Sequence, residues 1–174
     1  MTKRLAIFVL LSILAFGCAA PPIDWTNPQE VSSRIYTKYD NFTKVTVFVG
    51  PNLKYNDVDW YSNTLLIRAW KPDATSEITY QIYVEDFYYD DEWRFYSAAF
   101  DDSGASLDVL AISREPHCSR DGCNHTEIIG IYVSRDYLLK HQDGGIRFKL
   151  IGKRGEKIFY IPGVYIQAFL NAAK

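Results

Sequence analysis

From Thr43 onward the chain alternates apolar and more polar residues with a period of two. The alternation is cleanest where Ile78, Tyr80, Ile82 and Val84 are separated by single, more polar residues. Successive side chains of a β-strand point to opposite faces, so this pattern predicts strands with one buried face. The 27 aromatic residues among 174 (13 Tyr, 10 Phe and 4 Trp) favour the same structure, because aromatic rings pack well on strands.

Eight segments carry this pattern and are separated mostly by turn sequences. They are residues 44–49, 63–70, 78–85, 93–100, 107–114, 127–133, 146–151 and 157–161. Strands at such short intervals predict an antiparallel β-sandwich, with a barrel as the alternative that we consider weaker. We therefore expect a mainly β fold in which residues 43–174 form a single sandwich domain.

Short helices are expected on both sides of the strands. Asn27 is a favourable helix cap, Pro28 suits a first helical position, and Val31, Ile35 and Tyr39 follow at four-residue spacing. This pattern predicts a helix over about 28–39, with an extended linker as the alternative. A second short helix is expected after Ser134, over residues 135–140, and a third after Pro162, where apolar residues recur at helical spacing to the C-terminus.

One turn has a specific mechanism. In Asp101-Asp102-Ser103-Gly104, Gly104 tolerates a positive φ and the aspartate side chains accept hydrogen bonds from the turn backbone. We expect a tight connection between two strands at this position.

The first seventeen residues are typical of a secretory signal peptide. Lys3 and Arg4 precede an apolar run of twelve residues, 5–16, whereas a membrane-spanning helix needs about 20. Small residues follow immediately before Cys18. We therefore expect residues 1–17 to be removed, so that 18–42 form a tether ahead of the domain.

The cysteine at the cleavage point makes this segment resemble a bacterial lipoprotein signal, in which the cysteine is acylated and becomes the first mature residue. The match departs from the usual pattern, since Leu14 lies one position early and Ala15 and Phe16 occupy the positions before Gly17. Ordinary cleavage at a small-x-small site is the alternative. The resemblance implies a palmitate-type anchor on Cys18, and Ala19 after it implies delivery to the outer membrane, facing the periplasm.

The domain itself resembles small exported bacterial proteins of unassigned function. Trp93-Arg94-Phe95-Tyr96, the two-cysteine loop and the segment 134–138 carry this likeness, which covers most of residues 43–170. It implies no activity.

The densest chemistry lies at residues 117–125, where two histidines flank two cysteines. His117, Cys118, Cys123 and His125 offer ligands for zinc or copper. If Cys118 faces Cys123 across a hairpin, however, His117 and His125 point to opposite faces of it. In an exported chain we therefore expect a Cys118–Cys123 disulfide, no bound metal and no cofactor, with a metal site as the alternative.

Two features are candidates for partner contact. Residues 85–92 contain five carboxylates at a hairpin tip, beside Tyr88, Tyr89 and Trp93. These rings suit an interface, because they bury area while keeping a polar group, although burial in the core is the alternative for Trp93. Arg120 and Asp121 lie in the loop that the disulfide would fix. Calcium binding by the carboxylates is a weaker possibility, since the spacing matches no EF-hand.

No motif of a known catalytic class is present: the chain lacks G-x-S-x-G, H-E-x-x-H and a phosphate-binding glycine loop. A net charge of −2 argues against nucleic acid, which calls for a basic patch. We therefore expect a non-catalytic binding or structural module of the cell envelope, with an envelope protein or the cell wall as its partner. Metal handling through the 117–125 segment is the alternative, and a hydrolase of wall sugars ranks last.

Overall fold

The computed structural model describes residues 23–53, 63–90, 92–120 and 122–174, which form nine strands and three short helices. The strands are β1 (Tyr36–Asp40), β2 (Val45–Val49), β3 (Thr64–Pro72), β4 (Thr79–Tyr88), β5 (Tyr96–Asp101), β6 (Ser106–Ser119), β7 (Gly122–Val133), β8 (Ile146–Gly152) and β9 (Gly155–Ile161). All pairings are antiparallel, and the order in the sheet is β1-β2-β3-β4-β7-β6-β5-β8-β9. The expected mainly β, antiparallel fold is confirmed.

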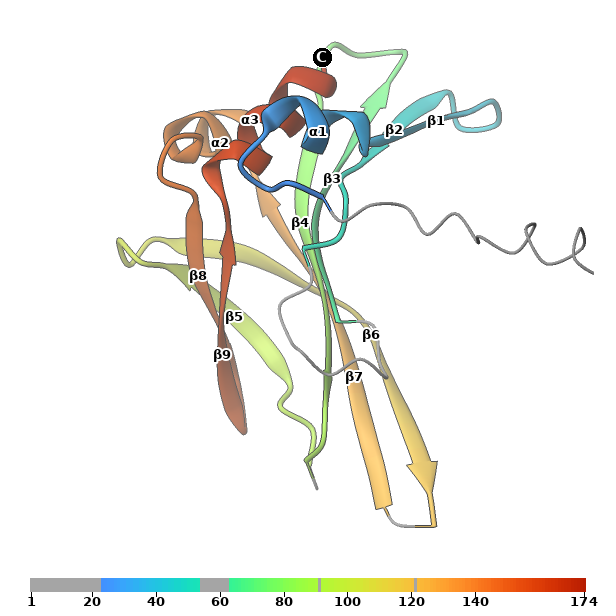
Figure 1. The fold of residues 1–174 in the computed structure, drawn as a ribbon. Coiled ribbons are helices and arrows are strands. Elements are labelled where there is room, and N and C mark those ends of the chain that lie inside the picture. Colours follow the sequence, from blue (N-terminus) through green and yellow to red (C-terminus); the bar gives the residue numbers. More distant parts are fainter. Residues whose placement is uncertain (1–22, 54–62, 91, 121) are drawn as a thin grey trace, which may run out of the picture.

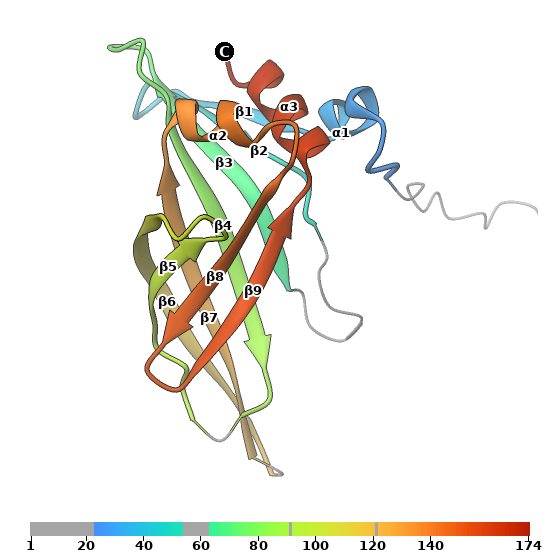
Figure 2. The ribbon, with the colours of Figure 1, turned by 90° about the vertical axis from the view of Figure 1, so that its left-hand side faces the viewer.

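The sheet folds over on itself and so forms the two layers of a sandwich (Figure 2). A small layer of β5, β8 and β9 lies over a large layer that contains β3, β4, β7 and β6. The alternation seen in the sequence places the apolar positions of both layers inside. These buried core residues are Ile82, Val84, Ile129 and Ile131 of the large layer and Phe148, Leu150, Phe159 and Ile161 of the small layer.

The helices α1 (Pro28–Ser33), α2 (Arg135–His141) and α3 (Gly163–Ala172) gather at one end of the sandwich (Figure 1). The α3 helix closes this end, because its Tyr165 and Phe169 side chains are buried in the core. The Tyr165 hydroxyl accepts a hydrogen bond from the Ile67 amide (3.1 Å) and donates one to the Pro51 carbonyl (2.9 Å). Within the described ranges, no helix has the length and hydropathy needed to cross a bilayer.

The N-terminal region differs from its prediction. The Asn27 side chain caps α1 as expected, but the helix ends at Ser33 rather than near residue 39. Residues 36–40 form β1 instead, with Tyr36 opposite Val49 of β2. A short isolated helix is marginal, whereas pairing with the free side of β2 satisfies the backbone, and Tyr and Thr favour strands. The sheet therefore begins before residue 43 and has nine strands rather than about eight.

The predicted turn at residues 101–104 is confirmed. Gly104 has a φ of 85°, and the Asp101 carboxylate accepts hydrogen bonds from the amides of Ser103 (2.9 Å) and Ala105 (2.9 Å). The Tyr137 hydroxyl of α2 donates to the second carboxylate oxygen (3.1 Å). Burial alone would raise the pKa of Asp101, but the hydrogen bonds from Ser103, Ala105 and Tyr137 outweigh it and hold that pKa below its ordinary value.

Asp101→Asn is expected to lower the free energy of unfolding at neutral pH by about 1–3 kcal/mol, because the turn loses a charged acceptor. A carboxyl whose pKa is depressed by folding stabilises the fold above its unfolded pKa, and this contribution is lost as pH falls through the folded pKa. The variant should therefore lose less stability than the parent on acidification. Thermal melts between neutral pH and pH 3 measure this, and parallel curves for parent and variant would contradict it.

Candidate functional site

A long hairpin of β6 and β7 projects past the rest of the sheet, at the end opposite the helices (Figure 1). Its tip carries the Cys118–Cys123 disulfide, with an S–S distance of 2.06 Å, which confirms the expected bridge. The segment between Arg114 and Glu127, expected as a loop, is therefore mostly strand. We call residues 87–90, 92–93, 117–120 and 122–125 the far end of the molecule.

The far end brings together the two contact features that the sequence suggested separately. Tyr88 of β4 lies opposite His125 of β7 in the sheet register. The Trp93 ring contacts the His125 ring, with centroids 4.3 Å apart. On the other face of the sheet, Phe87 contacts both Tyr89 (5.1 Å between centroids) and His117 (5.9 Å). The acidic tip and the disulfide hairpin thus meet at one end of the molecule, with aromatic contacts on both faces of the sheet.

The predicted contact residues differ in exposure. Tyr89 is 62% exposed, Trp93 is half-buried and Arg120 is exposed. Tyr88 is 5% exposed, so it lies beneath the surface and supports the far end without presenting a ring to solvent. Asp121 and Cys18 lie outside the described residues.

The four candidate metal ligands do not converge. His117 lies opposite Asn124 and His125 lies opposite Pro116, so the two histidines point to opposite faces of the hairpin. The His117 Nε2 atom is 3.1 Å from the Thr126 hydroxyl, and both cysteines are in the disulfide. In the part of the chain that the structure describes, no three His, Cys, Asp or Glu side chains are grouped to hold a metal.

Two fully buried carboxylates lie just inside the far end, opposite each other on β4 and β7. Glu127 accepts hydrogen bonds from the Tyr88 hydroxyl (2.6 Å) and the amides of Phe95 (2.9 Å) and Tyr96 (3.1 Å). Arg114 of β6 donates its Nε to the same carboxylate at 3.2 Å. Glu127 therefore ties residues 93–96, which we call the return segment, to the inner side of the large layer.

Asp86 connects the two layers. Its carboxylate accepts from the Tyr96 hydroxyl (2.9 Å), from Arg94 Nη1 (3.1 Å) and from Lys157 Nζ of β9 (2.5 Å). Asp86 has no exposed side-chain surface, whereas the two cations are about one-fifth exposed. The network thus holds an anion inside and two cations at its rim.

These contacts position Trp93. The return segment turns sharply, with Phe95 in the left-handed region at a φ of 54°, and the Arg94 amide donates to the Tyr88 hydroxyl (2.9 Å). Burial, followed by the neighbouring Asp86 carboxylate, raises the pKa of Tyr96, and burial together with the hydrogen bond to Glu127 raises that of Tyr88. Both hydroxyls therefore remain protonated donors at neutral pH.

The network is structural in its chemistry, because the oxygens of Asp86 and Glu127 already accept hydrogen bonds from protein groups. The sequence analysis did not identify this network, although the alternation contains a signal for the burial of its two acids. Asp86 is in phase with Ile82 and Val84, and Glu127 is in phase with Ile129, so both acids stand at inward positions of apolar strands. A charge at such a position requires partners inside the fold.

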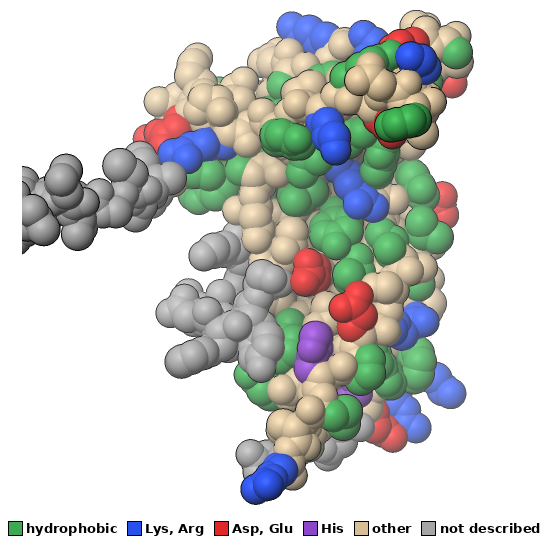
Figure 3. Space-filling view, turned by 90° about the vertical axis from the view of Figure 1, so that its right-hand side faces the viewer, with side chains coloured by type: hydrophobic (Ala, Val, Ile, Leu, Met, Phe, Trp, Pro, Cys, Tyr) green, Lys and Arg blue, Asp and Glu red, His purple; other side chains and the backbone are tan. Residues whose placement is uncertain are grey.

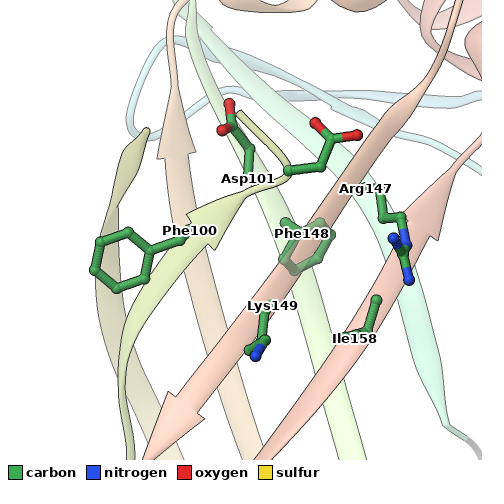
Figure 4. A pocket seen from close by; sticks show the side chains of 7 residues that line it. Phe100, Asp101, Arg147, Phe148, Lys149 and Ile158 are labelled. Carbon is green, nitrogen blue, oxygen red and sulfur yellow. The ribbon is translucent and has the colours of Figure 1, made fainter. Parts of the chain in front are cut away.

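A hollow lies on the outer side of the small layer (Figure 4). Phe100 of β5 and Ile158 of β9 flank it, and Arg147 and Lys149 of β8 border it. The hollow is shallow, with a volume of about 110 Å³, and Lys149 is already paired with Glu156 at 3.0 Å. Fewer side chains are held in place around this hollow than at the far end.

No family model matches this chain, and neither a curated protein nor a solved structure matches it.

Proposed function

We propose that this chain is a lipid-anchored, non-catalytic binding module of the bacterial cell envelope, and that it binds its partner through the far end. One observation carries the proposal: the acidic tip and the disulfide hairpin, separate in sequence, meet at the far end through aromatic contacts on both faces of the sheet. Tyr89 is exposed there and Trp93 is half-exposed, with Arg120 nearby on the hairpin. Aromatic and arginine side chains dominate the binding energy of interfaces.

The arrangement of the ends is compatible with an N-terminal anchor. The first described helix, α1, lies among the helices, and the far end lies at the opposite end of the sandwich (Figures 1 and 2). An attachment at Cys18 would therefore leave the far end uncovered. The disulfide suits an oxidising compartment outside the cytoplasm.

A role in metal handling gains no support from this geometry, because the cysteines are paired and the histidines diverge. The saturated carboxylates likewise favour a structural role for Asp86 and Glu127. Binding through the far end is the function that these observations support best.

The test is co-sedimentation of the mature chain with envelope fragments, cell-wall sacculi and outer-membrane vesicles being assayed separately. Tyr89→Ala combined with Arg120→Ala should weaken binding about tenfold or more, because truncating anchor side chains costs this much. Ile158→Ala, an exposed apolar residue of the small layer, is the matched control.

Two results would overturn the proposal. Equal binding by the far-end variant and the Ile158→Ala control would remove the far end as the contact surface. The intact mass of the protein from its native membrane tests the anchor: acylated Cys18 and a gain of two protons on reduction are expected. An unmodified cysteine would refute the anchor.

A further inference from the structure

The outer side of the large layer, which faces away from β5, β8 and β9, carries a broad apolar surface. Figure 3 looks onto this side from the direction opposite to Figure 2, and shows hydrophobic side chains gathered over the strands with acidic ones among them. Two exposed members are Leu110 (43% exposed) and Tyr132 (39%). A contiguous apolar surface of this kind marks an interaction site.

Arg68 is a half-buried cation on this surface. Its guanidinium carbon lies 4.9 Å from the centroid of the Trp70 ring and 4.5 Å from that of Tyr83. Its Nε donates to the Gln81 side chain at 2.8 Å. Burial lowers the pKa of Arg68, and among the described residues no carboxylate pairs with it. The Trp70 and Tyr83 rings position the guanidinium, and neither they nor Gln81 provide the acidic group that a guanidinium binds best.

Glu85 lies further along the same face. Arg68 pairs with Gln81 across β3 and β4, and Glu85 is four residues beyond Gln81 on β4, about 13 Å at the rise of a strand. Burial raises the pKa of Glu85, the hydrogen bond with the Thr64 hydroxyl lowers it, the nearby Glu115 of β6 raises it further, and the nearby His117 lowers it. Two carboxylates, Glu85 and Glu115, therefore lie toward the same end of this face.

An apolar row crosses the sheet midway between the two charges. Tyr83 is two residues from Gln81 and two from Glu85, and it lies opposite Leu66 on one side and Gly130 on the other. Gly130 in turn lies opposite Leu110 of β6. Along the strands, Arg68 and Glu85 therefore lie two residues on either side of the row that contains Leu66, Tyr83 and Leu110.

From this symmetry we propose that the outer side of the large layer binds a second copy of this chain. The two sheets pack face to face about a two-fold axis that lies between them and runs across the strands at the level of Tyr83. This rotation reverses the strand direction and keeps each strand over the same strand of the partner, so Gln81 of each copy lies over the partner's Glu85, beside the Arg68 guanidinium that is hydrogen-bonded to Gln81. Facing sheets are about 10 Å apart, a gap that arginine and glutamate side chains span together.

A second copy fits better than an unrelated partner, because one face supplies both halves of the charge match, as an isologous interface requires. The two far ends then point in opposite directions. The dimer is independent of the proposed envelope-binding function, and its test reads out association between copies alone.

The experiment is sedimentation equilibrium and native mass spectrometry of the mature chain over a range of concentrations. A dimer is expected. Arg68→Glu and Glu85→Arg should each lower the association constant at least about tenfold, because like charges then face each other twice per dimer. Arg147→Glu, a charge reversal on the exposed side of the small layer, is the matched control and should dimerise as the parent does.

An equal mixture of the Arg68→Glu and Glu85→Arg chains provides the decisive result. Each chain then faces one of opposite charge at both positions, so the mixture should form heterodimers with nearly parental affinity. Heterodimer formation also shows that both variants are folded. A monomeric parent at all concentrations, or a mixture that associates no better than its components, would overturn the proposal.

Discussion

Glu127→Ala is expected to lower the free energy of unfolding by about 3–5 kcal/mol, and Glu127→Gln by somewhat less. The carboxylate is fully buried and accepts hydrogen bonds from a hydroxyl, two backbone amides and Arg114. Removing one partner of a buried ion pair leaves a cation and several donors uncompensated, and this is the costly case for buried charges. Urea unfolding of each variant measures the loss.

Glu156→Ala is the matched control, because Glu156 also pairs with a cation, Lys149 at 3.0 Å, but on the exposed side of the small layer. Exposed pairs contribute about 0–1 kcal/mol, so this variant should unfold close to the parent. Hydrogen exchange gives a local reading of the same prediction: the amides of Phe95 and Tyr96 should exchange faster in Glu127→Gln. Unchanged protection of both amides would show that Glu127 does not hold the return segment.

The alternation of the sequence predicted eight of the nine strands, because the fold buries one side of each of them. It predicted the inward positions of Ile82 and Val84. The pairing of Cys118 with Cys123 was expected from the exported context and from hairpin geometry, and it is confirmed. The alternation did not predict β1, because the four-residue spacing of Val31, Ile35 and Tyr39 is compatible with a helix until the free side of β2 is present.

The polar network around Asp86 and Glu127 could not be predicted from the sequence, for a different reason. Its members come from β4, β6, β7, β9 and the return segment, and they meet only when the sheet folds over. Neighbours in sequence showed that Glu85 and Asp86 point to opposite faces. They did not show that Lys157, 71 residues away, would meet Asp86 between the layers. Likewise, Tyr88 is buried because the return segment covers it, a contact that no local pattern specifies.

Asp86→Asn is expected to cost about 3–5 kcal/mol, because it removes the buried carboxylate that both Arg94 and Lys157 contact. Both cations are about one-fifth exposed and can partly turn toward solvent, which places the expected loss at the lower end of this range. Unlike Glu127, Asp86 joins the large layer to β9 of the small layer. The loss should therefore appear in the global unfolding transition and in the amide protection of β9.

A double-mutant cycle separates the energy of the Asp86–Lys157 contact between the layers from the cost of burying a charge. In the Asp86→Asn background, Lys157→Met removes a cation whose contact with the Asp86 carboxylate is already lost, while its apolar stem is retained. We expect the double variant to lose about 1–3 kcal/mol less unfolding free energy than the two single variants lose in sum. A purely additive cycle in urea unfolding would mean that Lys157 and Asp86 act independently. In that case the layers would be held by the apolar core of β8 and β9 alone.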